Sequence, residues 1–359
     1  MKGRRPRPLD DGDLTQRISV KRVRVKRVKW DDSFMASTLV NTPSAVSKAA
    51  KALFDGHLVA FPTETVYGLG VDAGNRNSTK KMYSIKARPA NHPVIVHISN
   101  TSLLRIWTEN IPSYANLLAN KYWPGPMTLI LPKASDCGDY LTGGQANIGI
   151  RIPRNPVALA ILSEFEKMGG MGVAAPSANI FGSISPTSAY DVELEIGNRL
   201  GKMDLIVDGG RCEIGIESTI IDCSNLDPRI LRYGAITKEM IEEFLQIKLS
   251  SNKSVENFRH SGSFESHYSP NAELILSSEA RNGDGFIALS SYPTPAGAIR
   301  LSSPANSEEY AHNLYYSLRL GDTYGLKRIY AIPPDGDGIA AAINDRLNRA
   351  SAKPKFKSS

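Results

Sequence analysis

Short apolar runs alternate with amphipathic segments between residues 43 and 245. Residues 43–56 place apolar side chains on one helical face, and Gly56 is suited to end that helix. Further helices are expected at 78–86, 113–123, 156–166 and 237–245. Strands are expected at 58–61, 94–98, 128–131, 148–152, 172–175, 204–207, 219–222 and 230–232. This mixture predicts an α/β fold with an open, twisted mixed sheet and flanking helices.

Residues 246–271 interrupt the pattern, because Lys, Ser, Asn, His and Gly dominate there and the apolar periodicity ends. A β-β-α-β-α run follows, which predicts a small C-terminal Rossmann-like α/β domain. A length of 359 residues also favours about two domains. We therefore expect a basic arm at 1–42, a first domain at 43–245, a linker or lid at 246–271, a second domain at 272–352 and a tail at 353–359.

The net charge of +7 is concentrated in the arm. Residues 1–30 hold 11 Lys and Arg against three Asp, which leaves the remainder of the chain with a net charge of −1. Such an arm attracts RNA through counterion release, or it is a solvated tail that keeps the protein in solution. The folded body itself is not basic.

Three cysteines, Cys137, Cys212 and Cys223, have no paired spacing. This count disfavours a disulfide framework and a zinc site, and it indicates buried free thiols in a reducing compartment. No apolar run reaches the roughly 18 residues that span a bilayer, and residues 1–30 lack the apolar segment of a secretory signal. We expect a cytoplasmic protein with no membrane contact and no protein-held metal.

Two polar segments lie where a strand, a loop and a helix are expected to meet: Lys86-Ala87-Arg88-Pro89 and Pro176-Ser177-Ala178-Asn179. They bring cations and neutral hydrogen-bonding groups without an acidic pair, which suits a polyanion better than proton transfer. The first segment suits phosphate capture, or its cations stabilise a helix C-terminus. The second follows a buried strand, where open α/β sheets bind ligands, or it is a simple turn.

Thr63 and Thr65 follow another expected strand and precede Gly68 and Gly70. Hydroxyls and glycines at a strand end suit a small ligand, or the threonines satisfy only local backbone groups. The chain has neither Gly-x-x-x-x-Gly-Lys nor Gly-x-Gly-x-x-Gly, so no common nucleotide motif is present.

These segments occur in the order found in threonylcarbamoyl-AMP synthases, which have a YrdC-type domain, and the chain resembles that family over about residues 43–245. The matching segments are residues 61–70, 86–93, 123–128, 175–179, 217–219 and 231–234. His267-Tyr268-Ser269-Pro270 and residues 340–348 are similar to the linker and C-terminal domain of the longer, two-domain form.

The resemblance implies that L-threonine, bicarbonate (or CO2) and ATP give threonylcarbamoyl-AMP and pyrophosphate. The product would pass to the downstream transferase machinery that makes N6-threonylcarbamoyladenosine in tRNA, and direct tRNA contact is not required. Because the substrates supply both nucleophile and leaving group, the protein need only position them and offset charge. Mg²⁺ is expected to arrive with ATP.

The resemblance also implies residue roles. Lys86 and Arg88 are the expected catalytic residues. The expected L-threonine contacts are Thr65, His97, Arg151, Ala175 and Ser218. The expected ATP contacts are Arg88, His92, Thr128, Ser177, Asn179, Ser185, Arg232 and Tyr268, the last being a linker side chain that closes over the nucleotide.

The family's usual stretch reads Lys-Gly-Arg-Pro-x-x-Asn-Pro-Leu, whereas Ala87, His92 and Val94 stand here for Gly, Asn and Leu. Ala87 is expected to require a negative φ, and His92 can still hydrogen-bond a phosphate. One alternative function is an RNA-binding module that uses the arm and a basic cleft. Another, a carbamoyltransferase of hydrogenase maturation, needs Cys-rich zinc motifs that three scattered cysteines cannot form.

Overall fold

A computed structural model describes residues 37–249 and 268–352. Most of the expected arm, most of the linker and the tail lie outside these ranges, and so does the RNA-binding role considered for the arm. Residues 37–40, which the sequence places in the arm, form strand β1 (Ser37–Val40) instead. The folded part of the chain thus begins earlier than the apolar periodicity indicates, because this edge strand buries little of its surface.

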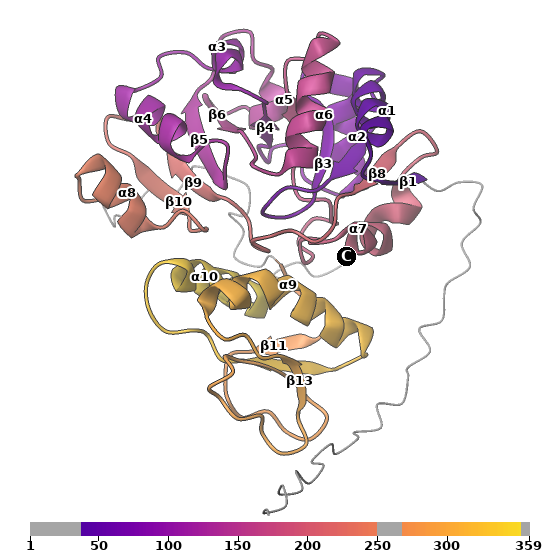
Figure 1. Ribbon diagram of the computed structural model, residues 1–359, viewed down its shortest axis with the longest axis vertical. Coiled ribbons are helices and arrows are strands. Elements are labelled where there is room, and N and C mark those ends of the chain that lie inside the picture. Colours follow the sequence, from indigo (N-terminus) through magenta and orange to yellow (C-terminus); the bar gives the residue numbers. More distant parts are fainter. Residues whose placement is uncertain (1–36, 250–267, 353–359) are drawn as a thin grey trace, which may run out of the picture. The chain divides into compact units, whose positions relative to one another are not determined.

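A ten-stranded mixed sheet forms the first part of the described chain, in the order β1-β8-β2-β3-β7-β4-β6-β5-β9-β10 (Figure 1). Its other strands are β2 (Val59–Phe61), β3 (Gly68–Asp72), β4 (Ile95–His97), β5 (Met127–Pro132), β6 (Asn147–Arg151), β7 (Val173–Ala174), β8 (Leu205–Asp208), β9 (Thr219–Asp222) and β10 (Arg229–Arg232). The sheet contains both parallel and antiparallel strand pairs. For example, β4 pairs with β6 in parallel, whereas β5 pairs with β6 antiparallel. The expected open mixed sheet is confirmed.

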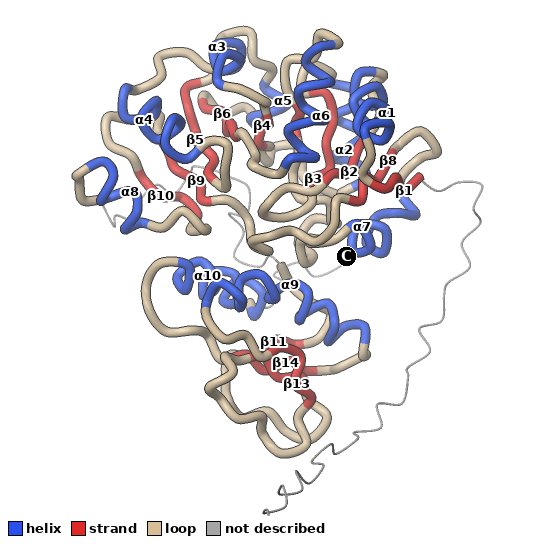
Figure 2. The backbone as a smooth tube through the Cα atoms, in the orientation of Figure 1, coloured by secondary structure: helices blue, strands red, loops and turns tan. Residues whose placement is uncertain are grey.

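Helices cover both faces of this sheet (Figure 2). They are α1 (Pro43–Phe54), α2 (Arg76–Ile85), α3 (Leu104–Trp107), α4 (Ser113–Tyr122), α5 (Asp139–Thr142), α6 (Pro156–Lys167), α7 (Ala189–Ile196) and α8 (Lys238–Leu245), with 3₁₀ turns at Thr101–Leu103 and Gly197–Arg199. Successive strand residues point to opposite faces. Accordingly, Phe61 and Val173 pack with α1 and α6, while Ala60 and Ala174 join the core under α2, α4 and α7.

The C-terminal part is a four-stranded parallel sheet in the order β11-β14-β12-β13, as expected for a small Rossmann-like domain. Its elements are β11 (Glu273–Ile275), β12 (Gly285–Ile287), β13 (Ile299–Ser302), α9 (Ser307–Thr323), β14 (Arg328–Ala331) and α10 (Ile339–Ser351). One apolar cluster joins α9 and α10 to this sheet and also includes Val66, Ile184 and Ile216 from the first part. The two parts therefore share a core.

Gly68 and Gly70 lie within β3, where we expected glycines that admit a ligand. A Cβ atom at Gly70 would lie 2.6 Å from Phe61 Cε1 and 2.8 Å from Val173 Cγ1. The absence of a side chain there permits close packing of the sheet.

Cys137, Cys212 and Cys223 are buried free thiols, as expected. Burial raises the pKa of each thiol, that of Cys137 to about 11. Among the described residues, no helix has the length and apolar character needed to span a bilayer.

Candidate active site

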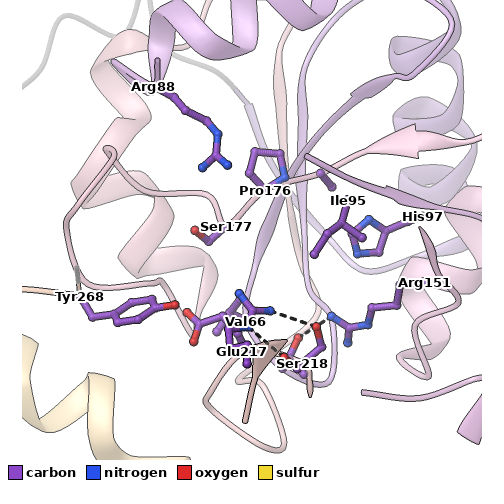
Figure 3. A pocket seen from close by; sticks show the side chains of 13 residues that line it. Val66, Arg88, Ile95, His97, Arg151, Pro176, Ser177, Glu217, Ser218 and Tyr268 are labelled. Atoms are coloured by element: carbon purple, nitrogen blue, oxygen red, sulfur yellow. Dashed lines mark hydrogen bonds between the residues drawn. The ribbon is translucent and has the colours of Figure 1, made fainter. Parts of the chain in front are cut away.

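One pocket gathers side chains from the ends of five strands, from the loop after α2 and from the linker (Figure 3). It is lined by Thr65, Val66, Arg88, Ile95, His97, Arg151, Ala175, Pro176, Ser177, Glu217, Ser218, Arg232 and Tyr268. All five residues expected to contact L-threonine lie here, and so do Arg88, Ser177, Arg232 and Tyr268 of the ATP set. The strand ends therefore converge, as the sequence indicates.

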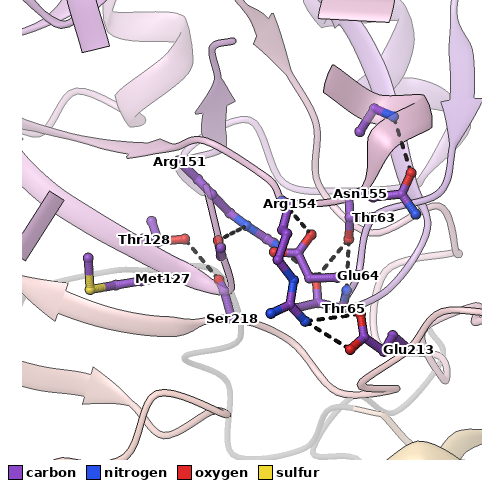
Figure 4. A network of polar contacts seen from close by, with 12 residues as sticks. Thr63, Glu64, Thr65, Met127, Thr128, Arg151, Arg154, Asn155, Glu213 and Ser218 are labelled. Atoms are coloured by element: carbon purple, nitrogen blue, oxygen red, sulfur yellow. Dashed lines mark hydrogen bonds and ion pairs between the residues drawn. The ribbon is translucent and has the colours of Figure 1, made fainter. Parts of the chain in front are cut away.

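A hydrogen-bonded turn orients the Thr65 hydroxyl (Figure 4). The Thr63 hydroxyl donates to the Val66 carbonyl at 2.6 Å and lies 2.8 Å from Thr65 Oγ1. Arg151 Nη1 donates to Thr65 Oγ1 at 2.9 Å. Thr63 thus stabilises the turn, whereas Thr65 lines the pocket.

Arg151 is held by a buried carboxylate. Its Nη2 atom lies 2.8 Å from Glu64 Oε1, an ion pair without a well-aligned hydrogen bond, and both side chains are buried. The second oxygen of Glu64 accepts from the Arg154 backbone N–H at 3.0 Å. Sequence reasoning did not single out Glu64, although it stands between the two threonines.

Ser218 lies between two other candidates. Its hydroxyl is 2.8 Å from Thr128 Oγ1 and accepts from Arg232 Nη2 at 3.1 Å, while Arg232 Nε donates to the Ser218 carbonyl at 3.0 Å. Thr128, an expected ATP contact, therefore stands behind Ser218 and is not among the lining residues.

Arg88 places a buried cation on the side of the pocket away from His97 and Arg151 (Figure 3). Its Nη2 donates to the Pro93 carbonyl at 2.8 Å, and its guanidinium lies 5.4 Å from the centre of the Phe181 ring. Its buried Nε has no hydrogen-bond partner within residues 37–249 and 268–352. Burial lowers the pKa of this guanidinium. Because the unpartnered Nε–H belongs to the Arg88 cation itself, this guanidinium is suited to bind an anionic ligand.

Lys86, which is expected to bind phosphate as a point charge, contacts backbone carbonyls in this structure. Its Nζ donates to the carbonyls of Ser177 and Asn179, the side chain is fully buried, and it is not among the lining residues. Burial, and then the nearby Arg88, lowers the pKa of Lys86 well below its usual value. The amine joins the end of α2 to the loop after β7, so it brings the two polar segments of the sequence together.

The loop after α2 also corrects the expectation for Ala87, whose φ is +48°. Arg88 N–H donates to the Tyr83 carbonyl and Ala87 N–H to the Ser84 carbonyl, which is the Schellman ending of a helix. Alanine therefore adopts the left-handed conformation that usually favours glycine, at a cost of roughly 1 kcal/mol. The hydrogen bonds of the helix end impose this φ on Ala87.

Three further members of the expected ATP set lie next to the pocket without lining it. Asn179 donates through Nδ2 to the carbonyls of Ile180 and Ser183, both at 2.8 Å, and its buried Oδ1 has no hydrogen-bond partner in the described part of the chain. The Ser185 hydroxyl donates to Glu217 Oε1 at 2.6 Å. His92 packs beside Phe181, with ring centres 5.5 Å apart.

Two residues that carry no assigned role in the sequence reasoning contact these groups. Glu217 lines the pocket, and Arg346 of α10 donates to it through Nε at 2.9 Å. Glu217 stands directly before Ser218, a position that could have drawn attention to it. Arg346 lies 129 residues further along the chain, and no sequence pattern connects the two.

His97 presents a neutral imidazole to the pocket. It is 3% exposed, and its Nδ1 atom has no hydrogen-bond partner among the described residues. Burial, and then the charge of Arg151, lowers the pKa of His97 to about 3. The ring therefore stays uncharged at neutral pH and offers its free nitrogen to a ligand.

This burial predicts a pH-dependent stability. In the unfolded chain His97 has its ordinary pKa of about 6.5, whereas in the folded chain its pKa is about 3. Between these two values the unfolded chain binds a proton at His97 and the folded chain does not. The free energy of unfolding should therefore fall by about 2 kcal/mol between pH 7 and pH 5 through this residue. Urea unfolding of the wild type and of His97→Gln at several pH values checks this. The difference between the two curves should change with pH, and parallel curves would contradict the assignment.

Comparison with known proteins identifies the family. Residues 51–234 match the family model described as "Telomere recombination", and residues 236–352 match "Threonylcarbamoyl-AMP synthase, C-terminal domain". The threonylcarbamoyl-AMP synthase of Pyrococcus abyssi (strain GE5 / Orsay) is 36% identical over 325 residues, which cover 84% of this chain and 93% of that protein. That of Bacillus subtilis (strain 168) is 35% identical over 348 residues, covering 91% and 98%.

The fold agrees with these matches. The crystal structure of P. abyssi Sua5 complexed with L-threonine superposes with a TM-score of 0.78 at 34% identity, covering 88% of this chain and 97% of that chain. The chain therefore belongs to the threonylcarbamoyl-AMP synthase family, with both the YrdC-type and the C-terminal domain present.

Proposed function

We propose that the pocket holds L-threonine and ATP together, with L-threonine beside Thr65, His97 and Arg151 and the phosphates of ATP beside Arg88 and Arg232. The activity is that of the family, synthesis of threonylcarbamoyl-AMP for the t6A modification of tRNA. One observation carries the assignment. Three buried guanidinium groups line the pocket, and its lining carboxylate, Glu217, already accepts three hydrogen bonds.

The L-threonine side suits an amino acid whose amine must react. Arg151 brings positive charge, the His97 ring is neutral, and the Glu64 carboxylate is paired with Arg151. A cation without a free carboxylate disfavours the ammonium form of the substrate and leaves more of it as the nucleophilic amine. That amine attacks the carbon of CO2 and releases a proton to give the carbamate, or it attacks bicarbonate, whose hydroxyl leaves as water with that proton. The relative from P. abyssi was solved with L-threonine bound.

The ATP side suits displacement at the α-phosphorus. A carbamate oxygen forms the new P–O bond, and the bond to the β-phosphate bridging oxygen breaks to release pyrophosphate. Negative charge develops on the phosphate oxygens, which Arg88 and Arg232 would offset from a desolvated wall. Such a transfer needs positioning and charge stabilisation, and no side chain has to become covalently attached.

The other expected contacts fit around this pair of subsites. Ser177 and Tyr268 line the pocket and are proposed to contact the nucleotide. Thr128 and Ser185 would act through the lining residues Ser218 and Glu217, which they contact. Asn179 would act through the loop at Ile180 and Ser183, whose carbonyls its amide contacts. Lys86 would hold the Ser177 loop in place through its contact with the Ser177 carbonyl.

The described residues contain no group of three His, Cys, Asp or Glu side chains that could hold a metal ion. Glu217 is the carboxylate among the pocket-lining residues, and its hydrogen bonds to Ser185, Tyr315 and Arg346 occupy it. The pocket therefore does not fit a protein-held Mg²⁺ site. An ion that accompanies ATP would be bound by phosphate and water.

Pyrophosphate release by the purified protein tests the proposal. Release should require L-threonine and bicarbonate together with ATP, and mass spectrometry should detect threonylcarbamoyl-AMP in equimolar amount. Omission of either co-substrate is the control. Equal pyrophosphate release without L-threonine would mean that the pocket hydrolyses ATP or transfers it to another acceptor, and it would exclude this function.

A further inference from the structure

Glu217 connects the pocket to the C-terminal domain. Its Oε1 accepts from Ser185, and its Oε2 accepts from Tyr315 OH at 2.8 Å and from Arg346 Nε at 2.9 Å. Tyr315 lies on α9 and Arg346 on α10, and both are fully buried. Burial would raise the pKa of Glu217, but Arg346 and Arg232 outweigh it and lower that pKa to about 2. The carboxylate is therefore charged at any working pH.

Arg346 also contacts the backbone next to Arg232, a second residue that lines the pocket. Its Nη2 donates to the carbonyl of Tyr233 at 2.9 Å. Tyr233 directly follows Arg232, and Glu217 directly precedes Ser218. One guanidinium thus contacts both residues that flank the Ser218–Arg232 pair, one before β9 and the other after β10. A planar guanidinium can make these contacts in fixed directions, whereas an ammonium cannot.

The linker side chain is held by the same two residues. The Tyr268 ring stacks on Tyr315, with ring centres 5.6 Å apart and an angle of 29° between the planes. Arg346 Cζ lies 5.6 Å from the centre of the Tyr268 ring. Tyr268 adopts φ +64°, a conformation that persists in a non-glycine residue only where the surroundings impose it.

We propose that Tyr315 and Arg346 are positioning residues for the reaction: through Glu217 and the Tyr233 carbonyl they set the geometry of Ser218, Arg232 and Tyr268, and so the affinity of the pocket for the nucleotide. This inference rests on the proposed function of the pocket. It gives the C-terminal domain a direct part in ATP recognition, although neither residue is among those that line the pocket.

Tyr315→Phe is the sharpest test, because it removes only the hydroxyl that donates to Glu217. Tyr310→Phe is the matched control. Tyr310 is a second buried tyrosine of α9, and its hydroxyl donates to the Ile332 carbonyl at 3.2 Å, within the C-terminal domain. We expect Tyr315→Phe to raise the KM for ATP about five- to tenfold. The KM of Tyr310→Phe should equal that of the wild type.

Arg346→Lys extends the test, since it keeps the positive charge and removes the planar guanidinium with its fixed N–H directions. Its KM for ATP should rise by about tenfold or more, and the Kd of a non-hydrolysable ATP analogue should rise by the same ratio. The double variant should show less than the product of the two single effects, because both act through Glu217. Tyr315→Phe alone decides the matter if Arg346→Lys does not fold.

Measuring kcat and KM separately distinguishes a change in pocket geometry from a loss of folded protein. Loss of folded protein lowers the apparent kcat and leaves KM unchanged, whereas a distorted pocket raises KM. Wild-type KM and Kd in Tyr315→Phe would overturn the proposal, as would an equal rise in Tyr310→Phe. The proposed function is judged separately, by whether the wild type forms threonylcarbamoyl-AMP.

Discussion

Replacement of Arg88 by alanine should lower the rate of threonylcarbamoyl-AMP formation by on the order of 100-fold or more. The guanidinium is buried, and its Nε has no hydrogen-bond partner among the described residues, so it keeps a donor for a phosphate oxygen. Removal of a preorganised cation from the place where phosphate charge develops affects the transition state more than the bound substrate. The effect should therefore appear in kcat, measured as pyrophosphate release at saturating substrates.

Two controls make this result specific. Arg105→Ala removes an exposed arginine of α3 and should leave kcat unchanged. Arg88→Lys keeps the charge but loses the fork and the contact with Phe181, so it should recover only part of the rate. A rate in Arg88→Ala within about threefold of the wild type would show that Arg88 is structural.

Arg151→Met should lower the free energy of unfolding by about 3–5 kcal/mol, because it leaves the Glu64 carboxylate buried without its cation. Glu64 is 2% exposed, so water cannot replace the lost charge. Methionine fills a similar volume, which keeps cavity formation out of the comparison. Urea unfolding followed by circular dichroism measures the change.

The neighbouring pair offers a matched control. Arg154 and Glu213 lie 2.9 Å apart, but their side chains are 52% and 70% exposed, so Arg154→Ala should cost less than about 1 kcal/mol. Replacing both members of the buried pair, as Arg151→Met with Glu64→Gln, should recover much of the stability lost in the single variant. If the double variant were as unstable as the sum of the single variants, the two charges would not be coupled.

The fold was predictable where periodicity and burial coincide. Helix α6 and the strands β5 and β9 are nearly as expected, because most of their apolar residues are buried. Helix α7 was missed since Tyr190 and Leu194 are 60% and 61% exposed, which blurs its periodicity. Its capping box of Ser188 and Asp191 was the available signal.

The pocket was predictable to the extent that its residues lie at strand ends. Arg151 and Arg232 end β6 and β10, and Ser218 precedes β9. The contacts that hold these residues were not predictable, because Arg346 and Tyr315 reach Glu217 from helices about 100 or more residues away. Tertiary pairing of this kind leaves no local pattern. The carbonyl partners of Lys86 were not predictable for a related reason, since they exist only when α2 and the loop after β7 meet.

The core shared by the two sheets limits how the enzyme can be shortened. A truncated chain ending at Leu249 would expose Val66, Ile184 and Ile216, which pack in the cluster of α9 and α10. It would also deprive Glu217 of its Arg346 partner while Arg232 remained nearby. A truncation at the linker thus removes the second domain and, with it, the Arg346 contacts that hold Glu217 and Tyr233 beside the pocket. A minimal version would require polar replacements at those three apolar positions and a new partner for the Glu217 carboxylate.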